Sequence, residues 1–286
     1  MQPRKLPKSN SPSRRRSLRL FRTWQGKLLL LLLLVGGLGG GFWFNEYRTM
    51  QWGEALNPAY WYHRWRGEDL YLPEEAVLLR GNRALPEVAL TFDDGPHRES
   101  RAQILAVLKH YGVHATFFDV GRRMEESPDL LRRTLAEGHE VANHSTNHNR
   151  LPGLSPALRH REINDTDTIF YRITGQHLSL LRPPGMRYTP EVLADTKAMG
   201  YLLVGYTTAA RDFDRSETAD FIAQRTLRRT ENGSIILLHD YRTTAQALPR
   251  IIENLKLQGF RCVTISEMID HLPAGTRQDA LAFLHR

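Results

Sequence analysis

Short apolar runs alternate with longer helical patterns from residue 87 onward, and this alternation limits the possible folds more than any other feature of the chain. It is typical of repeated strand–helix units, whose strands pair in parallel. The strands are expected at residues 88–92, 115–120, 140–143, 178–181, 201–206, 234–238 and 260–265. Seven strands in roughly 200 residues predict a distorted, nearly closed (β/α) barrel, with a doubly wound open sheet as the alternative.

The sequence also marks where the intervening helices begin and end. Helices are expected to start where proline follows a Ser or Thr cap, at Ser127-Pro128, Ser155-Pro156 and Thr189-Pro190. Glycine is expected to close the helical segments, at Gly112, Gly138, Gly175, Gly200 and Gly259.

Positive charge is concentrated at the N-terminus. Residues 1–27 hold nine of the 39 basic side chains and no acidic one, which leaves 30 basic against 31 acidic side chains elsewhere. The rest of the chain is therefore almost neutral, and we expect no nucleic-acid partner.

An uncharged, apolar segment follows this basic tail at residues 28–44. As a helix it would be about 26 Å long, enough to span a membrane, and the basic tail would stay in the cytoplasm. We therefore expect a cytoplasmic tail (1–27), a single transmembrane signal anchor (28–44), an aromatic-rich stem (45–85) and an extracytoplasmic domain (86–286). A cleaved signal peptide, which would release a secreted domain, is the alternative.

Unusual polar residues follow five of the predicted strands, at the end where parallel barrels carry their active sites. Two adjacent carboxylates repel each other unless a metal or an arginine gives them separate roles, which favours a functional site. A polar Asp-Gly turn is an alternative explanation for the adjacent aspartates. Two histidines four residues apart can share a metal if the segment between them is helical. These residues are Asp93 and Asp94, His144 and His148, Arg182, Asp212 and His239.

Four motifs resemble those of the polysaccharide deacetylase family, also called the NodB homology domain or carbohydrate esterase family four. They are TFDDGP (91–96), NHSTNH (143–148), RPPG (182–185) and ILLHD (236–240), in the family's order. The resemblance covers residues 87–269 and implies a distorted (β/α) barrel, a divalent metal and removal of acetyl groups from a polysaccharide.

The resemblance also assigns the metal ligands and the catalytic base. Asp94, His144 and His148 would bind one divalent metal, usually zinc, although such ligands also suit cobalt, nickel or iron. Asp93 would accept a proton from the attacking water. These roles are chemically reasonable, because a divalent cation held by two neutral imidazoles and one carboxylate keeps a net positive charge that can polarise a carbonyl and acidify a bound water.

Five further residues receive roles beside this metal site. Arg182 would pair with Asp93 and orient it, since a guanidinium matches a carboxylate. His239 would be the general acid, and Asp212 would raise its pKa and fix its orientation. Gly185 would offer a backbone N–H to the oxyanion, and Leu237 would line a pocket for the acetyl methyl group.

Three positions depart from the family's usual pattern. Gly185 replaces a frequent tyrosine, while Ala209 and Phe213 replace an aspartate and a tryptophan of the fourth motif. We therefore expect sugar binding to differ. The main hypothesis is a membrane-anchored deacetylase that acts on an envelope polysaccharide, such as peptidoglycan, chitin-like oligomers, poly-N-acetylglucosamine or xylan. The alternatives are a deformylase or deacylase of a lipid-linked sugar and a glycan-binding pseudoenzyme.

Overall fold

The computed structural model describes residues 71–72, 75–214 and 216–284, which belong to the compact unit Arg66–Arg286. The predicted tail, the predicted anchor and most of the stem lie outside the described residues. Within the described ranges, every helix is too short or too polar to cross a membrane.

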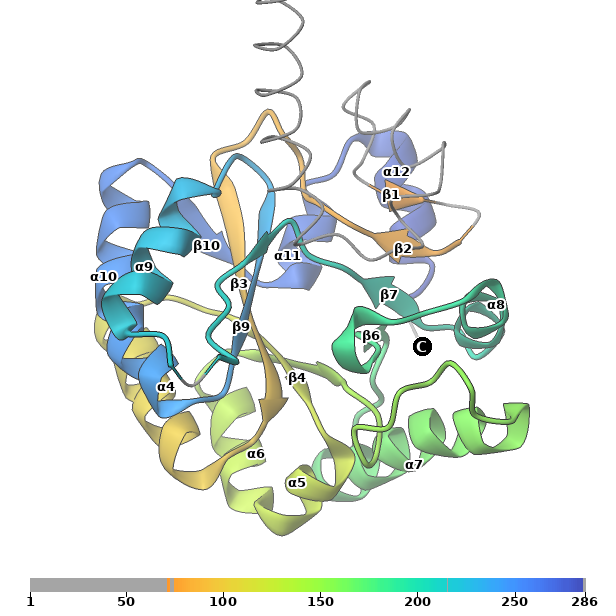
Figure 1. Cartoon of the computed structure of the whole chain (residues 1–286). Coiled ribbons are helices and arrows are strands. Elements are labelled where there is room, and N and C mark those ends of the chain that lie inside the picture. Colours follow the sequence, from red (N-terminus) through yellow and green to blue (C-terminus); the bar gives the residue numbers. More distant parts are fainter. Residues whose placement is uncertain (1–70, 73–74, 215, 285–286) are drawn as a thin grey trace, which may run out of the picture. The chain divides into compact units, whose positions relative to one another are not determined.

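Parallel strands form the centre of the fold, and all seven expected strands are present. Neighbouring strands follow the order β7-β6-β5-β4-β3-β9, and each neighbouring pair is parallel. The resulting half-barrel is surrounded by helices and is consistent with the predicted (β/α) barrel (Figure 1). The seven strands are β3 (Glu87–Gly95), β4 (Thr116–Asp119), β5 (Glu140–Asn143), β6 (Leu180–Leu181), β7 (Leu202–Val204), β9 (Ser234–His239) and β10 (Arg261–Val263).

Three strands of two residues each were not predicted. They are β1 (Tyr71–Leu72), β2 (Val77–Leu78) and β8 (Thr208–Ala209). β2 pairs with β7 and β8 pairs with β9, so these strands extend the sheet at both ends of the row. Only residues 205–207 separate β7 from β8, and this short link makes the row of strands curve back toward its other end.

The predicted helix boundaries are confirmed. α6, α7 and α8 begin at Pro128, Pro156 and Pro190, and the five predicted glycines all have positive φ at or just after helix ends. The helices are α4 (Arg98–Tyr111), α5 (Gly121–Glu126), α6 (Pro128–Ala136), α7 (Pro156–Thr174), α8 (Pro190–Ala198), α9 (Ala219–Arg228), α10 (Arg242–Leu257), α11 (Ile265–Asp270) and α12 (Ala274–Leu281), and a 3₁₀ turn, η2, covers Pro184–Met186.

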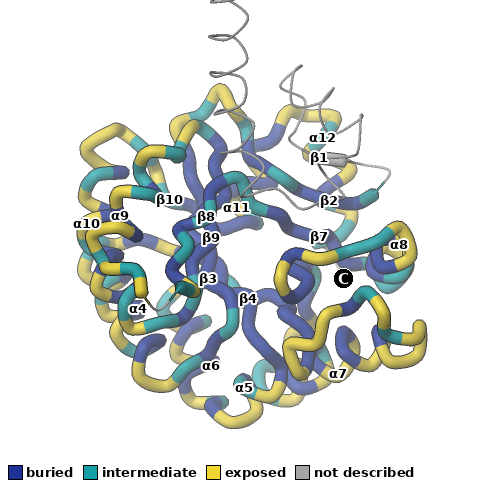
Figure 2. The backbone as a smooth tube through the Cα atoms, viewed as in Figure 1, coloured by how far each residue is buried: buried dark blue, intermediate teal, exposed yellow. Residues whose placement is uncertain are grey.

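Hydrophobic clusters bury the strands, and the surrounding helices present exposed residues outward (Figure 2). On β9, Ile236 and Leu238 pack in the cluster that contains residues of α4 and α10, whereas Ile235 packs in a second cluster. Side chains alternate along a strand, so Leu237 and His239 lie on the same side of β9 as Ile235. This alternation directs His239 toward the interior of the half-barrel.

Candidate active site

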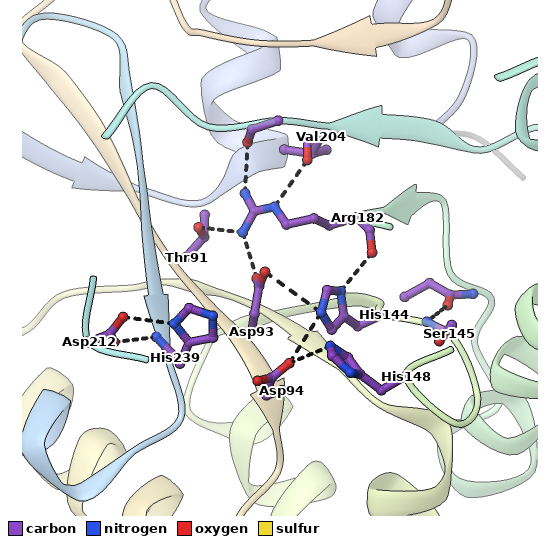
Figure 3. Close-up of polar contacts among 12 residues, drawn as sticks. Thr91, Asp93, Asp94, His144, Ser145, His148, Arg182, Val204, Asp212 and His239 are labelled. Atoms are coloured by element: carbon purple, nitrogen blue, oxygen red, sulfur yellow. Dashed lines mark hydrogen bonds and ion pairs between the residues drawn. The ribbon is translucent and has the colours of Figure 1, made fainter. Parts of the chain in front are cut away.

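Asp93 and Asp94 lie inside β3, so their predicted position after the strand is wrong. β3 continues to Gly95, and its register against β4 shifts between Asp93 and Gly95. Neighbouring side chains of a regular strand point to opposite faces. Here the bulge, with Asp94 in the left-handed region at φ 69°, brings both carboxylates toward one group of histidines (Figure 3).

His144 and His148 are carried by a loop after β5, so the segment between them is not helical. Ser145 and His148 have positive φ, and these turns bring the two rings to a centroid distance of 5.1 Å. Both Nε2 atoms face Asp94 Oδ1, at 3.4 Å from His144 and 3.0 Å from His148. The turns of the loop thus bring the two imidazoles together without a helix.

The orientation of the His144 ring is fixed by the backbone of Arg182. His144 Nδ1 lies 2.7 Å from the Arg182 carbonyl oxygen, which can only accept a hydrogen bond. Nδ1 therefore donates this hydrogen bond, and Nε2 is the ring nitrogen turned toward Asp94.

The three expected ligands fit a divalent metal. One donor atom from each of Asp94, His144 and His148 lies within 4.8 Å of the others, and together they form a possible metal site. Burial opposes the charge of Asp94, but hydrogen bonds from His144 and His148 more than offset it and hold the pKa of Asp94 well below its usual range. Two imidazoles and one anionic carboxylate are a donor set for which metals such as zinc have high affinity.

Asp93 lies beside this group but is held by a different partner. Its Oδ1 is 2.7 Å from Arg182 Nη1, while its Oδ2 is 3.8 Å from His144 Nε2. The two neighbouring aspartates therefore have separate surroundings. Asp94 faces the two imidazoles, and Asp93 faces the guanidinium.

Arg182 is fully buried and is not a surface ion pair. Its guanidinium donates to the carbonyl oxygens of Val204 and Gly205 and to Thr91 Oγ1, and it stacks on the Phe118 ring at 4.0 Å. These contacts hold the positive charge of Arg182 beside the link between β7 and β8. A buried guanidinium with this many fixed partners can orient a carboxylate without moving itself.

His239 is the last residue of β9, and its ring lies between Asp212 and Asp93 (Figure 3). Asp212 Oδ1 lies 2.8 Å from Nδ1, and Asp212 Oδ2 accepts hydrogen bonds from the His239 backbone N–H and from Thr244. Burial disfavours the imidazolium, but Asp212 prevails and raises the pKa of His239 to about 9. Asp212 follows β8, a strand that the sequence analysis missed, rather than β7.

We expect Asp212→Asn to lower the pKa of His239 in metal-free protein from about 9 toward its ordinary value of 6.5. Because the folded-state pKa is raised, the stabilisation by Asp212 is fully present below pH 6.5 and is lost as the pH rises through about 9. NMR titration of the imidazole nitrogens measures this shift. Asp214→Asn, in the same loop but bonded to Ser216, is the matched control. An unchanged His239 titration in Asp212→Asn would contradict the assignment.

The roles expected for Leu237 and Gly185 stay predictions. Leu237 shares the inner side of β9 with His239 and is 9% exposed. Gly185 lies in η2, three residues after Arg182, with φ 65°. A side chain would be strained in that conformation, which explains glycine here.

Asp240 belongs to the ILLHD motif, which by itself indicated no role for it. Asp240 and Asp119 are fully buried and both pair with Arg101, at 2.9 Å and 2.5 Å. A side chain at Gly95 would collide with all three residues, so glycine is needed for this close approach. This ion cluster packs against the end of β3 at Gly95 and follows the end of β9 at Asp240. Arg101 lies 18 positions from Asp119 and 139 positions from Asp240, and neither spacing gave a local signal of such pairing.

Two aromatic residues beside His239 were also not assigned to the site. The Phe213 ring meets the His239 ring edge-on at 5.9 Å and is 55% exposed. Tyr241 stacks on His239 and donates a hydrogen bond to Asp94. Phe213 therefore offers an accessible apolar face at the rim of the site.

Comparison with known proteins gives consistent matches. The family model described as polysaccharide deacetylase matches residues 80–204. The chain is 37% identical over 206 residues to the peptidoglycan-N-acetylmuramic acid deacetylase PdaC of Bacillus subtilis. This match covers 70% of this chain but 42% of that protein. The chain is also 35% identical over 188 residues to a peptidoglycan-N-acetylglucosamine deacetylase of Bacillus cereus, and this match covers 64% of this chain and 87% of that protein.

Solved structures show the same architecture. The PdaC structure superposes with a TM-score of 0.62 and covers 66% of this chain and 92% of that chain, at 37% identity. A family pseudoenzyme from Bacillus anthracis superposes with a TM-score of 0.66 and 28% identity, over 69% of this chain and 70% of that chain. Fold similarity therefore extends both to deacetylases and to a protein described as a pseudoenzyme.

Proposed function

Because this chain belongs to the polysaccharide deacetylase family, we propose that it is a metal-dependent hydrolase that removes N-acetyl groups, or O-acetyl groups, from an envelope polysaccharide. The observation that carries the proposal is one site in which Asp94, His144 and His148 lie within ligand distance, with Asp93 and His239 beside them.

Asp94, His144 and His148 would hold the metal, and zinc is the best match to their donor atoms, although cobalt, nickel and iron also accept such ligands. A divalent cation there would supply positive charge that polarises an acetyl carbonyl and acidifies a water molecule. The loop after β5 positions both imidazoles, and the bulge in β3 positions the carboxylate.

Asp93 is proposed as the general base that accepts a proton from the attacking water. Its Oδ1 is occupied by Arg182 at 2.7 Å, which leaves Oδ2, on the side of His144, to take the proton. The buried Arg182 keeps the carboxylate aimed.

His239 is proposed as the general acid that protonates the departing amine or alcohol. With a pKa of about 9, its imidazolium is the main form at neutral pH, as an acid requires. Asp212 holds Nδ1, so the other ring nitrogen, Nε2, is the proton donor. Leu237 is proposed to contact the acetyl methyl group, and Gly185 to donate its N–H to the oxyanion.

A peptidoglycan-type substrate is the leading choice, because both relatives described above carry peptidoglycan deacetylase names. The pseudoenzyme alternative is disfavoured because this site contains the proposed ligands, base and acid together. We also propose that residues 28–44 anchor the protein in the cytoplasmic membrane with the catalytic unit outside. The support for this anchor is the uncharged, apolar composition of residues 28–44 and the basic tail that precedes them.

Full-length protein in detergent should release acetate from at least one acetylated glycan, and chelation should abolish this activity until zinc is added back. The screen includes peptidoglycan, chitin oligomers, poly-N-acetylglucosamine, xylan and a lipid-linked acetylated sugar. Activity on the lipid-linked sugar alone would favour the deacylase alternative. Acetate release that is indifferent to chelation would contradict the metal site, and glycan binding without release would indicate a pseudoenzyme.

A further inference from the structure

Tyr241 contacts the site from the turn between β9 and α10, and the proposed reaction gives it no role. Its hydroxyl lies 2.9 Å from Asp94 Oδ2. A carboxylate can only accept a hydrogen bond, so the Tyr241 hydroxyl is the donor. The contact joins two segments 147 residues apart in sequence.

The two carboxylate oxygens of Asp94 have different neighbours. Oδ1 faces His144 Nε2 and His148 Nε2, while Oδ2 faces Tyr241. A metal shared with the imidazoles would therefore meet Oδ1, and Oδ2 is already occupied. This arrangement favours a carboxylate that binds through one oxygen.

The backbone of Asp94 is held separately from its carboxylate. Arg123 Nη1 donates to the Asp94 carbonyl oxygen, and the left-handed conformation at Asp94 is set by the bulge in β3. These contacts do not fix rotation of the carboxylate about its bond to the rest of the side chain. Among the described residues, Tyr241 and the two imidazoles are its side-chain hydrogen-bond partners, so without a metal Tyr241 alone orients Oδ2.

The Tyr241 ring has a second contact that is independent of its hydroxyl. It stacks on the His239 ring with a centroid distance of 5.5 Å and an interplanar angle of 8°. Phenylalanine at this position would keep the ring and its stacking but remove the donor. The role of the hydroxyl can therefore be tested separately from packing against the general acid.

We propose that Tyr241 is a positioning residue that holds Asp94 as a one-oxygen metal ligand, with Oδ1 turned toward His144 and His148. The inference rests on the metal site of the proposed function. Hydrogen bonds from outside a coordination shell orient the ligand and reduce its freedom, and their loss typically weakens metal binding by about 10- to 100-fold.

The test compares zinc affinity in Tyr241→Phe and wild-type full-length protein, by competition with a chromophoric chelator. We expect the dissociation constant for Zn²⁺ to rise by about 10- to 100-fold. Tyr111→Phe is the matched control, because it removes a hydroxyl that bonds Glu253 on the exposed surface between α4 and α10. Its zinc affinity should equal that of the wild type.

A second measurement separates positioning from a general structural role. Turnover of Tyr241→Phe should be lost at limiting zinc and restored by excess zinc, with an unchanged Tm of the metal-free protein. A lowered Tm of the metal-free protein with activity that zinc does not restore would overturn the proposal. Equal zinc affinity in Tyr241→Phe and wild type would overturn it as well.

The outcomes also distinguish this inference from the proposed function. If the wild type binds zinc but deacetylates no glycan, the proposed function fails, and the ratio of zinc affinities still decides the role of Tyr241. If the wild type binds no divalent metal, the metal site and this inference are both overturned.

Discussion

Asp93→Asn is expected to lower kcat for acetate release by about 10²- to 10⁴-fold while metal binding persists. Asparagine has nearly the same shape and keeps an oxygen that can accept the hydrogen bond of Arg182 Nη1, which lies 2.7 Å away. Its amide cannot take a proton from water at neutral pH. The measurement is kcat at saturating zinc, together with the zinc content of the purified protein.

The control for this variant is Asp129→Asn, which removes the same charge from α6, where Asp129 forms an exposed ion pair with Arg98 of α4. It should leave kcat unchanged. Near-normal turnover in Asp93→Asn would exclude Asp93 as the base. Loss of zinc in Asp93→Asn would instead make Asp93 a ligand, contrary to its pairing with Arg182.

His144→Ala is expected to abolish stoichiometric zinc binding and acetate release. One of three protein ligands disappears, so the loss in affinity should exceed the roughly 10- to 100-fold that is typical of outer hydrogen-bonding partners. His144 is buried and bonds the Arg182 carbonyl, so the variant also loses packing. Zinc content and the dissociation constant for Zn²⁺ measure the effect.

His148→Ala keeps this prediction testable if His144→Ala folds poorly. The His148 side chain is 43% exposed, so its removal disturbs little packing, yet its Nε2 lies 3.0 Å from Asp94 Oδ1. His160→Ala, which removes another exposed imidazole near a carboxylate, is the control. Stoichiometric zinc in both His144→Ala and His148→Ala would contradict the proposed ligand set.

The parts of the fold that the sequence predicted are those with a strong local signal. Proline after Ser155 and Thr189 marks two helix starts, because proline fixes φ and the hydroxyl caps a free N–H. The longer strands contain runs of apolar residues that are long enough to be recognised as strands in the sequence. β1, β2 and β8 have two residues each, too few for any periodicity, and depend on pairing with distant strands.

The spacing of the two histidines did not reveal how the chain brings them together. A separation of four residues suits one helical turn, but the segment from His144 to His148 is a loop whose positive φ values bring the rings together. Its shape depends on contacts with other elements, such as Asn147 with Glu162 of α7. Such contacts cannot be read from spacing.

The sequence by itself determined the alternation of strands and helices, the family and the chemical types of the site residues, because these depend on local pattern and motif order. Only the tertiary structure gave Asp93 and Asp94 separate surroundings, since a bulge and the pairing of β3 with β4 and β9 set where each carboxylate points. It also decided that Arg182 is buried and that Tyr241 reaches Asp94. These contacts join segments far apart in the chain, and no local preference encodes them.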